Sequence, residues 1–246
     1  MNCLIFKTPP PFRLDSDDAK LAHIRKVLKL SEGGEVFAGQ ADGKLYVCSL
    51  SSNGVGGATL FPIREIKNPA RANVSLAVAF ARPQIAQRLL FEAACFGAEN
   101  LVFYAAAKGE ADYLKSGLYA GGEYEKWLEK GAEQSCSTFI PKFRMAESLL
   151  QALEILSEVA PSNALKIAPD VYEATEGISS CLCRSDSPHT VAVLGGERGF
   201  ADADRILLRG KGYVLVSLGE RVLRTDSAAI ATLAAVSLCG RANATF

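Results

Sequence analysis

Leu218-Gly-Glu-Arg-Val-Leu-Arg-Thr-Asp-Ser-Ala228 is the stretch of this sequence that says most about its fold. The residues before it, 213–217, have the apolar character of a buried strand, and the glycine suits a tight turn at the end of that strand. Thr225 or Asp226 then suits the N-cap of an apolar helix over 226–239. The stretch therefore predicts a strand, a turn that carries two arginines, and a helix.

A second glycine-bearing turn, Leu194-Gly-Gly-Glu-Arg-Gly-Phe200, also follows an apolar strand, at 190–194. In open α/β sheets, ligands bind at the carboxyl ends of strands, where such turns expose backbone N–H groups. A tight strand-to-helix turn needs glycine for its own geometry, so a purely structural role stays open. The later stretch has two interpretations as well: a capped helix with solvated arginines, or a pocket lined by Val222 and Leu223 in which an arginine meets the substrate.

Hydrophobic patterning divides the chain into two parts. Up to residue 69, short strands and one helix over 19–30 alternate with turn signals, of which Asp42-Gly43 is typical of a β-hairpin. From residue 70 onward, buried strands alternate with helices, which predicts an α/β layer structure with a mainly parallel sheet. The helices expected there span 84–96, 122–134, 145–159, 202–209 and 226–239.

Composition narrows the class of protein. The 246 residues are 49% hydrophobic and 22% charged, with a formal net charge of zero. A protein that coats nucleic acid through charge alone is usually more basic, although a local basic face remains possible. No apolar run approaches the roughly 20 residues that cross a bilayer, and no signal-peptide pattern begins the sequence. We therefore expect a cytoplasmic protein without a membrane segment.

Several kinds of site are disfavoured by the motifs that are missing. The seven cysteines are scattered and there are only two histidines, which predicts reduced thiols and no metal site. Phe80-Ala-Arg-Pro83 stands where a dinucleotide fold would have its glycine-rich loop, and there is no P-loop. Ser187-Pro-His189 lacks the nucleophile elbow of serine hydrolases. His189 is expected to be a surface residue at a strand end.

The two turns resemble those of the RsmE family, which belongs to the SPOUT methyltransferases. The family pattern I-G-P-E-G-G-[FL] is matched at Gly195, Glu197, Gly199 and Phe200. The pattern L-G-x-R-[IV]-L-R-[TS]-E-T-A is matched at Leu218, Gly219, Arg221, Val222, Leu223, Arg224, Thr225 and Ala228. The second match is long and specific.

Other segments agree with the family in the same order. His23-Ile-Arg-Lys-Val-Leu-Lys-Leu30 is similar to the family's H-x-x-[RK]-V-L-R-[LM] helix, and Glu133-Gln-Ser135 to its E-Q-[SC] helix end. Two residues of the first turn depart from the pattern: Gly196 replaces a proline and Arg198 replaces a glycine. An arginine is strained at this position if the backbone there has a positive φ.

The resemblance implies S-adenosylmethionine-dependent methylation of uracil N3 in 16S ribosomal RNA. It implies a PUA-like β-barrel RNA-binding domain over 1–69 and a SPOUT methyltransferase domain with a trefoil knot over 70–246. It also implies a homodimer that forms through the knotted domain. The implied donor-binding residues are Leu194, Gly195, Gly196, Gly199, Leu218, Gly219, Val222, Leu223 and Thr225. The implied catalytic residues are Arg221, Arg224 and Glu197, and the RNA-binding residues are His23, Arg25, Lys26 and Lys29.

Two alternatives keep the fold but change the function. A SPOUT-fold protein whose altered turn at Gly196 and Arg198 no longer holds the donor would bind RNA without catalysis. A methyltransferase of the same fold could instead act on transfer RNA. Within the favoured interpretation, Glu197 or Asp226 removes the N3 proton or orients an arginine.

Overall fold

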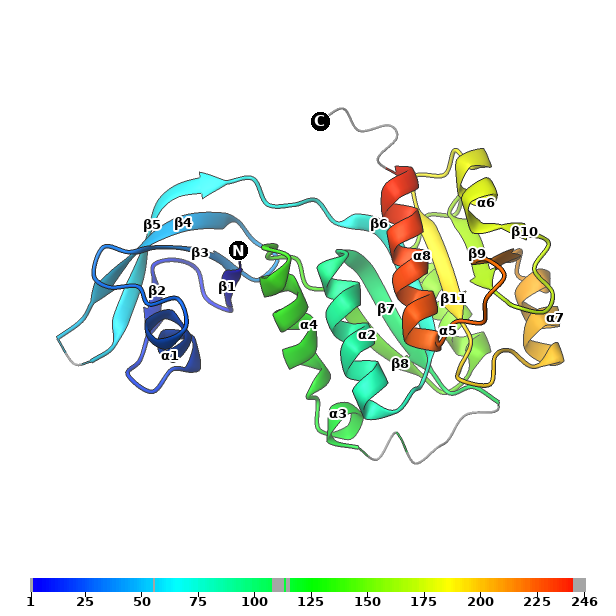
Figure 1. The fold of residues 1–246 in the computed structure, drawn as a ribbon, viewed down its shortest axis with the longest axis horizontal. Coiled ribbons are helices and arrows are strands. Elements are labelled where there is room, and N and C mark those ends of the chain that lie inside the picture. The colour runs from blue at the N-terminus through cyan, green and yellow to red at the C-terminus, as the bar shows by residue number, and fades with distance from the viewer. Residues whose placement is uncertain (1, 55, 108–112, 114–115, 241–246) are drawn as a thin grey trace. The chain divides into compact units, whose positions relative to one another are not determined.

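The computed structural model describes residues 2–54, 56–107, 113 and 116–240 (Figure 1). The chain forms two compact units. The first contains residues 1–70 and 129–140, and the second contains residues 71–128 and 141–246. Each unit has its own hydrophobic core. The predicted combination of a small β domain and an α/β domain is confirmed.

The first unit is a curled five-stranded sheet with one helix packed against it (Figure 1). The strand order is β1-β3-β4-β5-β2, in which β1 and β3 run parallel and the other neighbours run antiparallel. Phe6 and Phe12 stack at the centre of its core, with ring centroids 4.5 Å apart, and Leu21 and Ile24 of the helix are buried beside them. The elements are β1 (Cys3–Phe6), β2 (Phe12–Leu14), α1 (Ala19–Lys26), β3 (Glu35–Gln40), β4 (Leu45–Ser52) and β5 (Ala58–Ile66).

The helix of the first unit is shorter than the sequence predicts. A helix is expected over 19–30, but α1 ends at Lys26, and Val27 and Leu28 are exposed although their spacing suits the buried face. Lys29 has a left-handed backbone, with φ at +54°, which ends the helical path. Hydrophobic periodicity could not reveal the early end of this helix, because residues 19–30 contain no glycine or proline to mark it.

A segment distant in sequence completes the first unit. Residues 129–140 include the end of α4 (Tyr124–Gln134), from which Glu133 accepts hydrogen bonds from the Ile5 backbone N–H at 3.1 Å and from Lys20 Nζ at 2.8 Å. Lys20 also pairs with Glu129 at 2.6 Å. One partly buried carboxylate thus ties the first strand and the first helix to a segment more than a hundred residues further along the chain.

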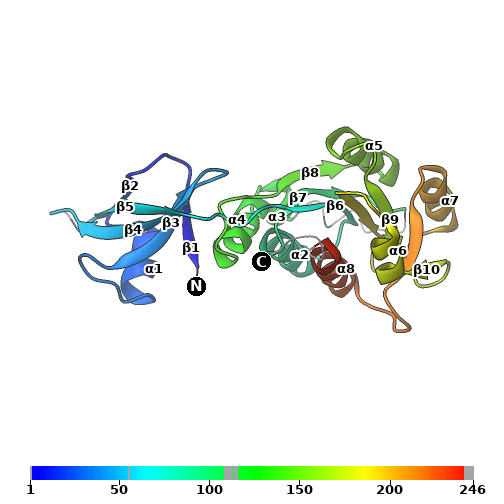
Figure 2. The same ribbon diagram turned by 90° about the horizontal axis from the view of Figure 1, so that it is seen from above.

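The second unit is built on a seven-stranded sheet in which all the described strand pairs are parallel. The strand order is β10-β12-β9-β11-β6-β7-β8. Helices α2 and α8 cover one face of the sheet, and α5 and α7 lie on the other (Figure 2). This arrangement confirms the predicted parallel α/β domain.

The bounds of these elements agree closely with the predicted strands and helices in most places. The strands are β6 (Ala72–Ala79), β7 (Ala98–Tyr104), β8 (Lys142–Ala146), β9 (Leu165–Pro169), β10 (Glu176–Gly177), β11 (Thr190–Leu194) and β12 (Val214–Ser217). The helices are α2 (Pro83–Cys95), α3 (Gly117–Ala120), α5 (Leu149–Val159), α6 (Ile178–Arg184), α7 (Asp202–Gly210) and α8 (Thr225–Gly240). No helix in the described part of the chain is both long and apolar enough to cross a membrane.

The predicted helix over 145–159 is wrong at its start. Met145 belongs to β8, an edge strand beside β7, and the helix begins only at Leu149. The Ser148 side chain caps it by accepting a hydrogen bond from the Gln151 backbone N–H at 3.2 Å. An edge strand exposes many of its residues, so its mixed pattern was indistinguishable from the amphipathic helix that follows.

His189 is buried, so the prediction of a surface residue is wrong. Its Nε2 lies 3.0 Å from Ser75 Oγ, and Ser75 Oγ accepts a hydrogen bond from Asn100 Nδ2 at 3.0 Å. Burial lowers the pKa of His189 below its ordinary value, against a smaller upward effect of Glu99. The lowered pKa favours the neutral imidazole, which is part of a polar chain that links β6 and β7 to the residue before β11.

This burial predicts a pH dependence of stability. A histidine whose pKa is lower in the folded state binds fewer protons when folded, so its contribution is present above about pH 6.5 and is lost as the pH falls. We expect the free energy of unfolding to fall more steeply between about pH 7.5 and about pH 5 in the wild type than in His189→Asn. Urea denaturation at several pH values measures both slopes. Equal slopes would contradict the buried, neutral state of His189.

Candidate functional site

A cavity of about 400 Å³ lies in the second unit, at the carboxyl ends of β9, β11 and β12. Four stretches of chain line it: residues 82 and 85 of the segment that begins α2, residues 169–172, residues 194–200, and residues 218–228 except 220 and 227. All nine residues predicted to hold the methyl donor and all three predicted catalytic residues are on this lining. The carboxyl edge of a parallel sheet is where ligands of α/β folds bind, and the two glycine-bearing turns meet there.

The first turn is closed by its own backbone. Gly199 N–H donates to the Gly196 carbonyl at 2.9 Å, and Gly199 has a φ of +66°, a conformation that side chains disfavour. A Cβ on Gly195 would lie 3.0 Å from the carbonyl carbon of Gly199 and 3.2 Å from the Phe200 nitrogen. The strand before the turn is anchored as well, because the Tyr104 hydroxyl donates to the Leu194 carbonyl at 2.9 Å.

Arg198 is not strained, which corrects the expectation drawn from its departure from the family pattern. The left-handed residue of this turn is Gly199, and Arg198 is not among the non-glycine residues with positive φ. Its side chain is exposed. At Gly196 a Cβ would meet only Ala79 Cβ, at 3.4 Å, so this position makes no demand for glycine. Both departures are compatible with the shape of the turn.

The second turn is tied to the first. Thr225, the first residue of α8, directs its hydroxyl to the Gly195 carbonyl at 3.5 Å. Between β12 and this helix, Val222 is 75% exposed, and Leu223 is also exposed, so apolar side chains stand at the mouth of the cavity. This arrangement favours the pocket interpretation of the stretch over a simple capped helix.

Charged side chains around the cavity differ in whether they are paired. Glu197 Oε1 lies 3.7 Å from Arg82 Nε. Asp226 is buried and pairs with Arg88 at 3.3 Å through one oxygen, and its other oxygen has no hydrogen-bond partner in the described part of the chain. Arg221 and Arg224 are exposed, and neither forms an ion pair with a described residue. These two arginines are therefore available to a ligand at the cavity.

One wall of the cavity, at residues 169–172, is not among the predicted site residues. Asp170 is buried directly after β9, and its Oδ2 accepts from Arg205 Nε at 3.0 Å. Its Oδ1 accepts from the backbone N–H groups of Tyr172 and Glu173, each at 2.7 Å. Burial alone would lower the pKa of Arg205, but the hydrogen bond and charge of Asp170 raise it. The available signal was a carboxylate at the end of a buried strand.

Comparison with known proteins identifies the family. Residues 68–237, well over half of the chain, match the family model described as the RNA methyltransferase domain. The chain belongs to the RNA methyltransferase family. The resemblance found at the two turns is therefore confirmed.

Relatives with curated names are similar over most of this methyltransferase. It is 29% identical over 224 residues to the Ribosomal RNA small subunit methyltransferase E of Treponema pallidum, a match that covers 89% of this chain and 82% of that protein. It is 23% identical over 227 residues to the Ribosomal RNA small subunit methyltransferase E 1 of Borreliella burgdorferi, with 87% and 88% covered. The crystal structure of the Neisseria gonorrhoeae Ribosomal RNA small subunit methyltransferase E bound to S-adenosyl methionine shares the fold, with a TM-score of 0.79, 17% identity and 97% of each chain covered.

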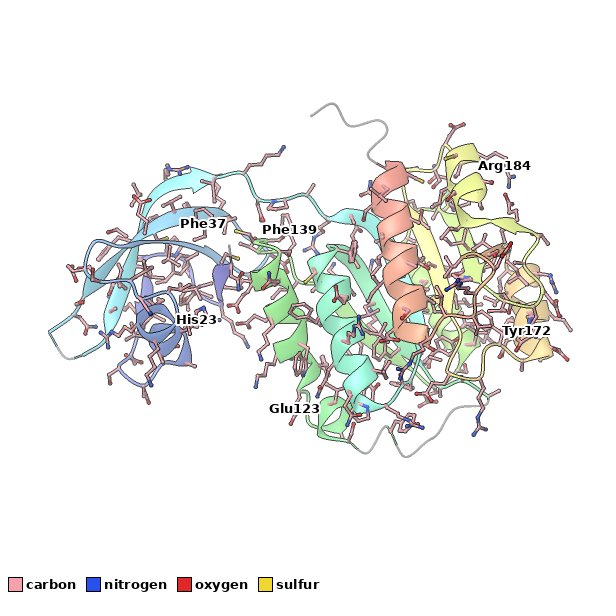
Figure 3. The ribbon with its side chains drawn as sticks, viewed as in Figure 1. His23, Phe37, Glu123, Phe139, Tyr172 and Arg184 are labelled. Carbon is pink, nitrogen blue, oxygen red and sulfur yellow. The ribbon has the colours of Figure 1, made fainter. Side chains whose placement is uncertain are left out.

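The four residues predicted to bind RNA lie together in the first unit of the methyltransferase. His23, Arg25 and Lys26 are on α1, and Lys29 follows just after its end (Figure 3 labels His23). Arg25, Lys26 and Lys29 are exposed, whereas His23 is half-buried. The end of the helix therefore carries three exposed cations. This charge suits binding of RNA phosphates, but the ordinary solvated side of a helix can carry the same charges.

The seven cysteines are free thiols, as predicted. Within the described residues, no group of three or more His, Cys, Asp or Glu side chains is arranged to hold a metal ion. The chemistry-bearing groups at the cavity of the methyltransferase are its arginines, carboxylates and backbone turns.

The geometry of the first turn makes a prediction about stability. In Gly195→Ala the added methyl meets backbone atoms that cannot move independently, so we expect a loss of about 1–3 kcal/mol in the free energy of unfolding. The matched control is Gly196→Ala, one residue later in the same turn, whose methyl meets only the Ala79 side chain at an ordinary distance. Urea denaturation compares the two, and equal stability of both variants would contradict the close approach at Gly195.

Proposed function

We propose that the protein transfers a methyl group from S-adenosylmethionine to N3 of a uridine in the 16S ribosomal RNA of the small subunit. The observation that carries the proposal is the meeting of both family turns at one cavity, joined by the contact of Thr225 with the Gly195 carbonyl. Arg221 and Arg224, which pair with no described residue, lie beside it. The names of the relatives support the ribosomal substrate. A substrate of this kind favours a cytoplasmic location.

The cavity suits S-adenosylmethionine in size and in lining. It combines apolar side chains with backbone groups of two tight turns, as sites for nucleoside-containing molecules commonly do. The residues proposed to hold the donor are Leu194, Gly195, Gly196, Gly199, Leu218, Gly219, Val222, Leu223 and Thr225. When bound there, the donor supplies an electrophilic methyl group on its sulfonium sulfur.

The reaction requires the N3 proton of uracil to leave, and negative charge then develops on the flanking carbonyl oxygens. Arg221 and Arg224 are exposed cations at the cavity and are suited to stabilise that charge. Glu197 is proposed to accept the proton or to orient its neighbour Arg82. N3 lies on the pairing edge of the base, so only an unpaired or flipped uridine can react.

The two alternative functions are RNA binding without catalysis and methylation of transfer RNA. A protein that binds RNA without catalysis would need a turn unable to hold the donor, and the unstrained Arg198 removes the reason for that interpretation. Methylation of transfer RNA is consistent with the same site, but the relatives are named for small-subunit RNA. The trefoil knot and the boundary of the RNA-binding domain at residue 69 stay predictions from the resemblance.

A homodimer is part of the proposal, and α8 favours it. Asp226 is the only charged residue among residues 225–240, so no side of the helix carries the charged residues of a solvated surface. Such a helix is normally covered all round. Leu238 is nevertheless 72% exposed, and Ile230 and Ala234 are half-buried. A second copy packed on this face would cover it, as the homodimer predicted from the resemblance requires.

The catalytic role of Arg224 is testable. Arg224→Ala should reduce methylation by about 10²- to 10³-fold, because a preorganised cation facing the developing charge is lost, while the fold stays intact. Mass spectrometry of 3-methyluridine in small-subunit RNA measures the activity, and circular dichroism checks the fold. The matched control is Arg144→Ala, an exposed arginine on β8 outside the cavity. Near-normal turnover of Arg224→Ala would remove this residue from the mechanism.

The role of the basic end of α1 in RNA binding is also testable. Phosphate contacts release counterions, so the double variant Lys26→Ala/Lys29→Ala should bind small-subunit RNA more weakly and with a flatter dependence on salt concentration, by roughly one to two units of slope. Lys44→Ala serves as the control, because this lysine of the same unit is already paired with Glu65 at 2.6 Å. Filter binding at several salt concentrations measures the slope; if the double variant keeps the wild-type slope, RNA docks elsewhere.

A further inference from the structure

Tyr172 is a large aromatic residue whose side chain is exposed to solvent at the cavity. It is 79% exposed and belongs to the wall formed by residues 169–172, after β9 (Figure 3). Val171 beside it and Val222 in the second turn are also exposed and line the same cavity. Exposed apolar side chains gathered around a cavity indicate a surface that is covered when a ligand binds.

Asp170 and Arg205 hold Tyr172 in place. Its backbone N–H donates to Asp170 Oδ1 at 2.7 Å, and Arg205 is fixed to Asp170 Oδ2 at 3.0 Å. The guanidinium carbon of Arg205 lies over the Tyr172 ring, 5.5 Å from its centroid. The Arg205 side chain is only 7% exposed, so one face of the ring lies against a buried cation. The high exposure of Tyr172 leaves the other face open.

The surroundings decide which kind of ligand fits that open face. Arg198, Arg221 and Arg224 line the same cavity, are exposed and form no ion pair with a described residue. An apolar protein segment would leave these cations uncompensated. A single-stranded nucleic acid satisfies both features, because its phosphates pair with arginines and its bases stack on aromatic rings.

We infer that Tyr172 is a stacking platform for an unpaired base of the RNA substrate at the mouth of the cavity. The inference rests on the proposed function and adds a substrate-binding residue to it. Stacking on the open face brings the base to the cavity that Arg221 and Arg224 also line. Arg205 and Asp170 are positioning residues, since they act through the tyrosine. Ordering the base in this way favours the unpaired state that methylation at N3 requires.

The test compares Tyr172→Ala with Tyr172→Phe. Stacking needs the ring and not the hydroxyl, so Tyr172→Ala should raise KM for unmethylated small ribosomal subunits roughly 10-fold, and Tyr172→Phe should restore it. The dissociation constant for S-adenosylmethionine, measured by calorimetry, should stay unchanged in both. Ile206→Ala is the control: Ile206 is 71% exposed on α7 but lies outside the cavity lining, and its removal should leave KM as it is.

Binding of a labelled eight-residue oligouridylate, measured by fluorescence anisotropy, separates failure of this inference from failure of the proposed function. If the wild type makes no 3-methyluridine, the proposed function fails, but weaker oligouridylate binding by Tyr172→Ala still supports the platform. If the wild type is active and Tyr172→Ala keeps both its KM and its oligouridylate affinity, the platform is wrong. A weakened affinity for S-adenosylmethionine alone would also overturn it, because Tyr172 would then contact the donor.

Discussion

The close approach of Gly195 to the backbone of Gly199 and Phe200 is the constraint on which the rest of the site depends. With no side chain at Gly195, the chain folds back on itself at the end of β11, and Phe200 enters the core of the second unit. The Gly195 carbonyl is then close enough to meet the Thr225 hydroxyl at the start of α8. Two turns separated by thirty residues thereby become two walls of one cavity.

The charged side chains at this cavity have two roles: the buried ones stabilise its wall, and the exposed ones are available to a ligand. Asp170 and Arg205 are buried and paired, with partners for both carboxylate oxygens, so the cost of removing them from water is offset and they fix the wall that carries Tyr172. Arg221 and Arg224 are exposed, and no described residue pairs with them. Cations left unpaired at a cavity are available to a phosphate or to a developing carbonyl charge, which is what an RNA methyltransferase needs.

Local patterns predicted the elements well where one periodicity dominated. Thr190–Leu194 was expected at the observed bounds, because a continuously apolar strand that ends at Gly195 leaves no competing pattern. The predictions failed where tertiary contacts overrode the pattern. Met145 lies in an edge strand because β7 offers it a hydrogen-bonding partner, and His189 is buried because Ser75 satisfies its ring nitrogen.

The sequence by itself determined the family and the two turns, since Gly195, Gly199 and the 218–228 stretch are local requirements of backbone conformation and chemistry. Only the tertiary structure decided that Gly199, and not Arg198, adopts the left-handed conformation, and that the turn is therefore unstrained. It also decided the pairing of Asp170 with Arg205 and the position of Tyr172 above that pair. Such contacts join residues far apart in the chain, and they form only when the parallel sheet brings the ends of β9, β11 and β12 to one edge.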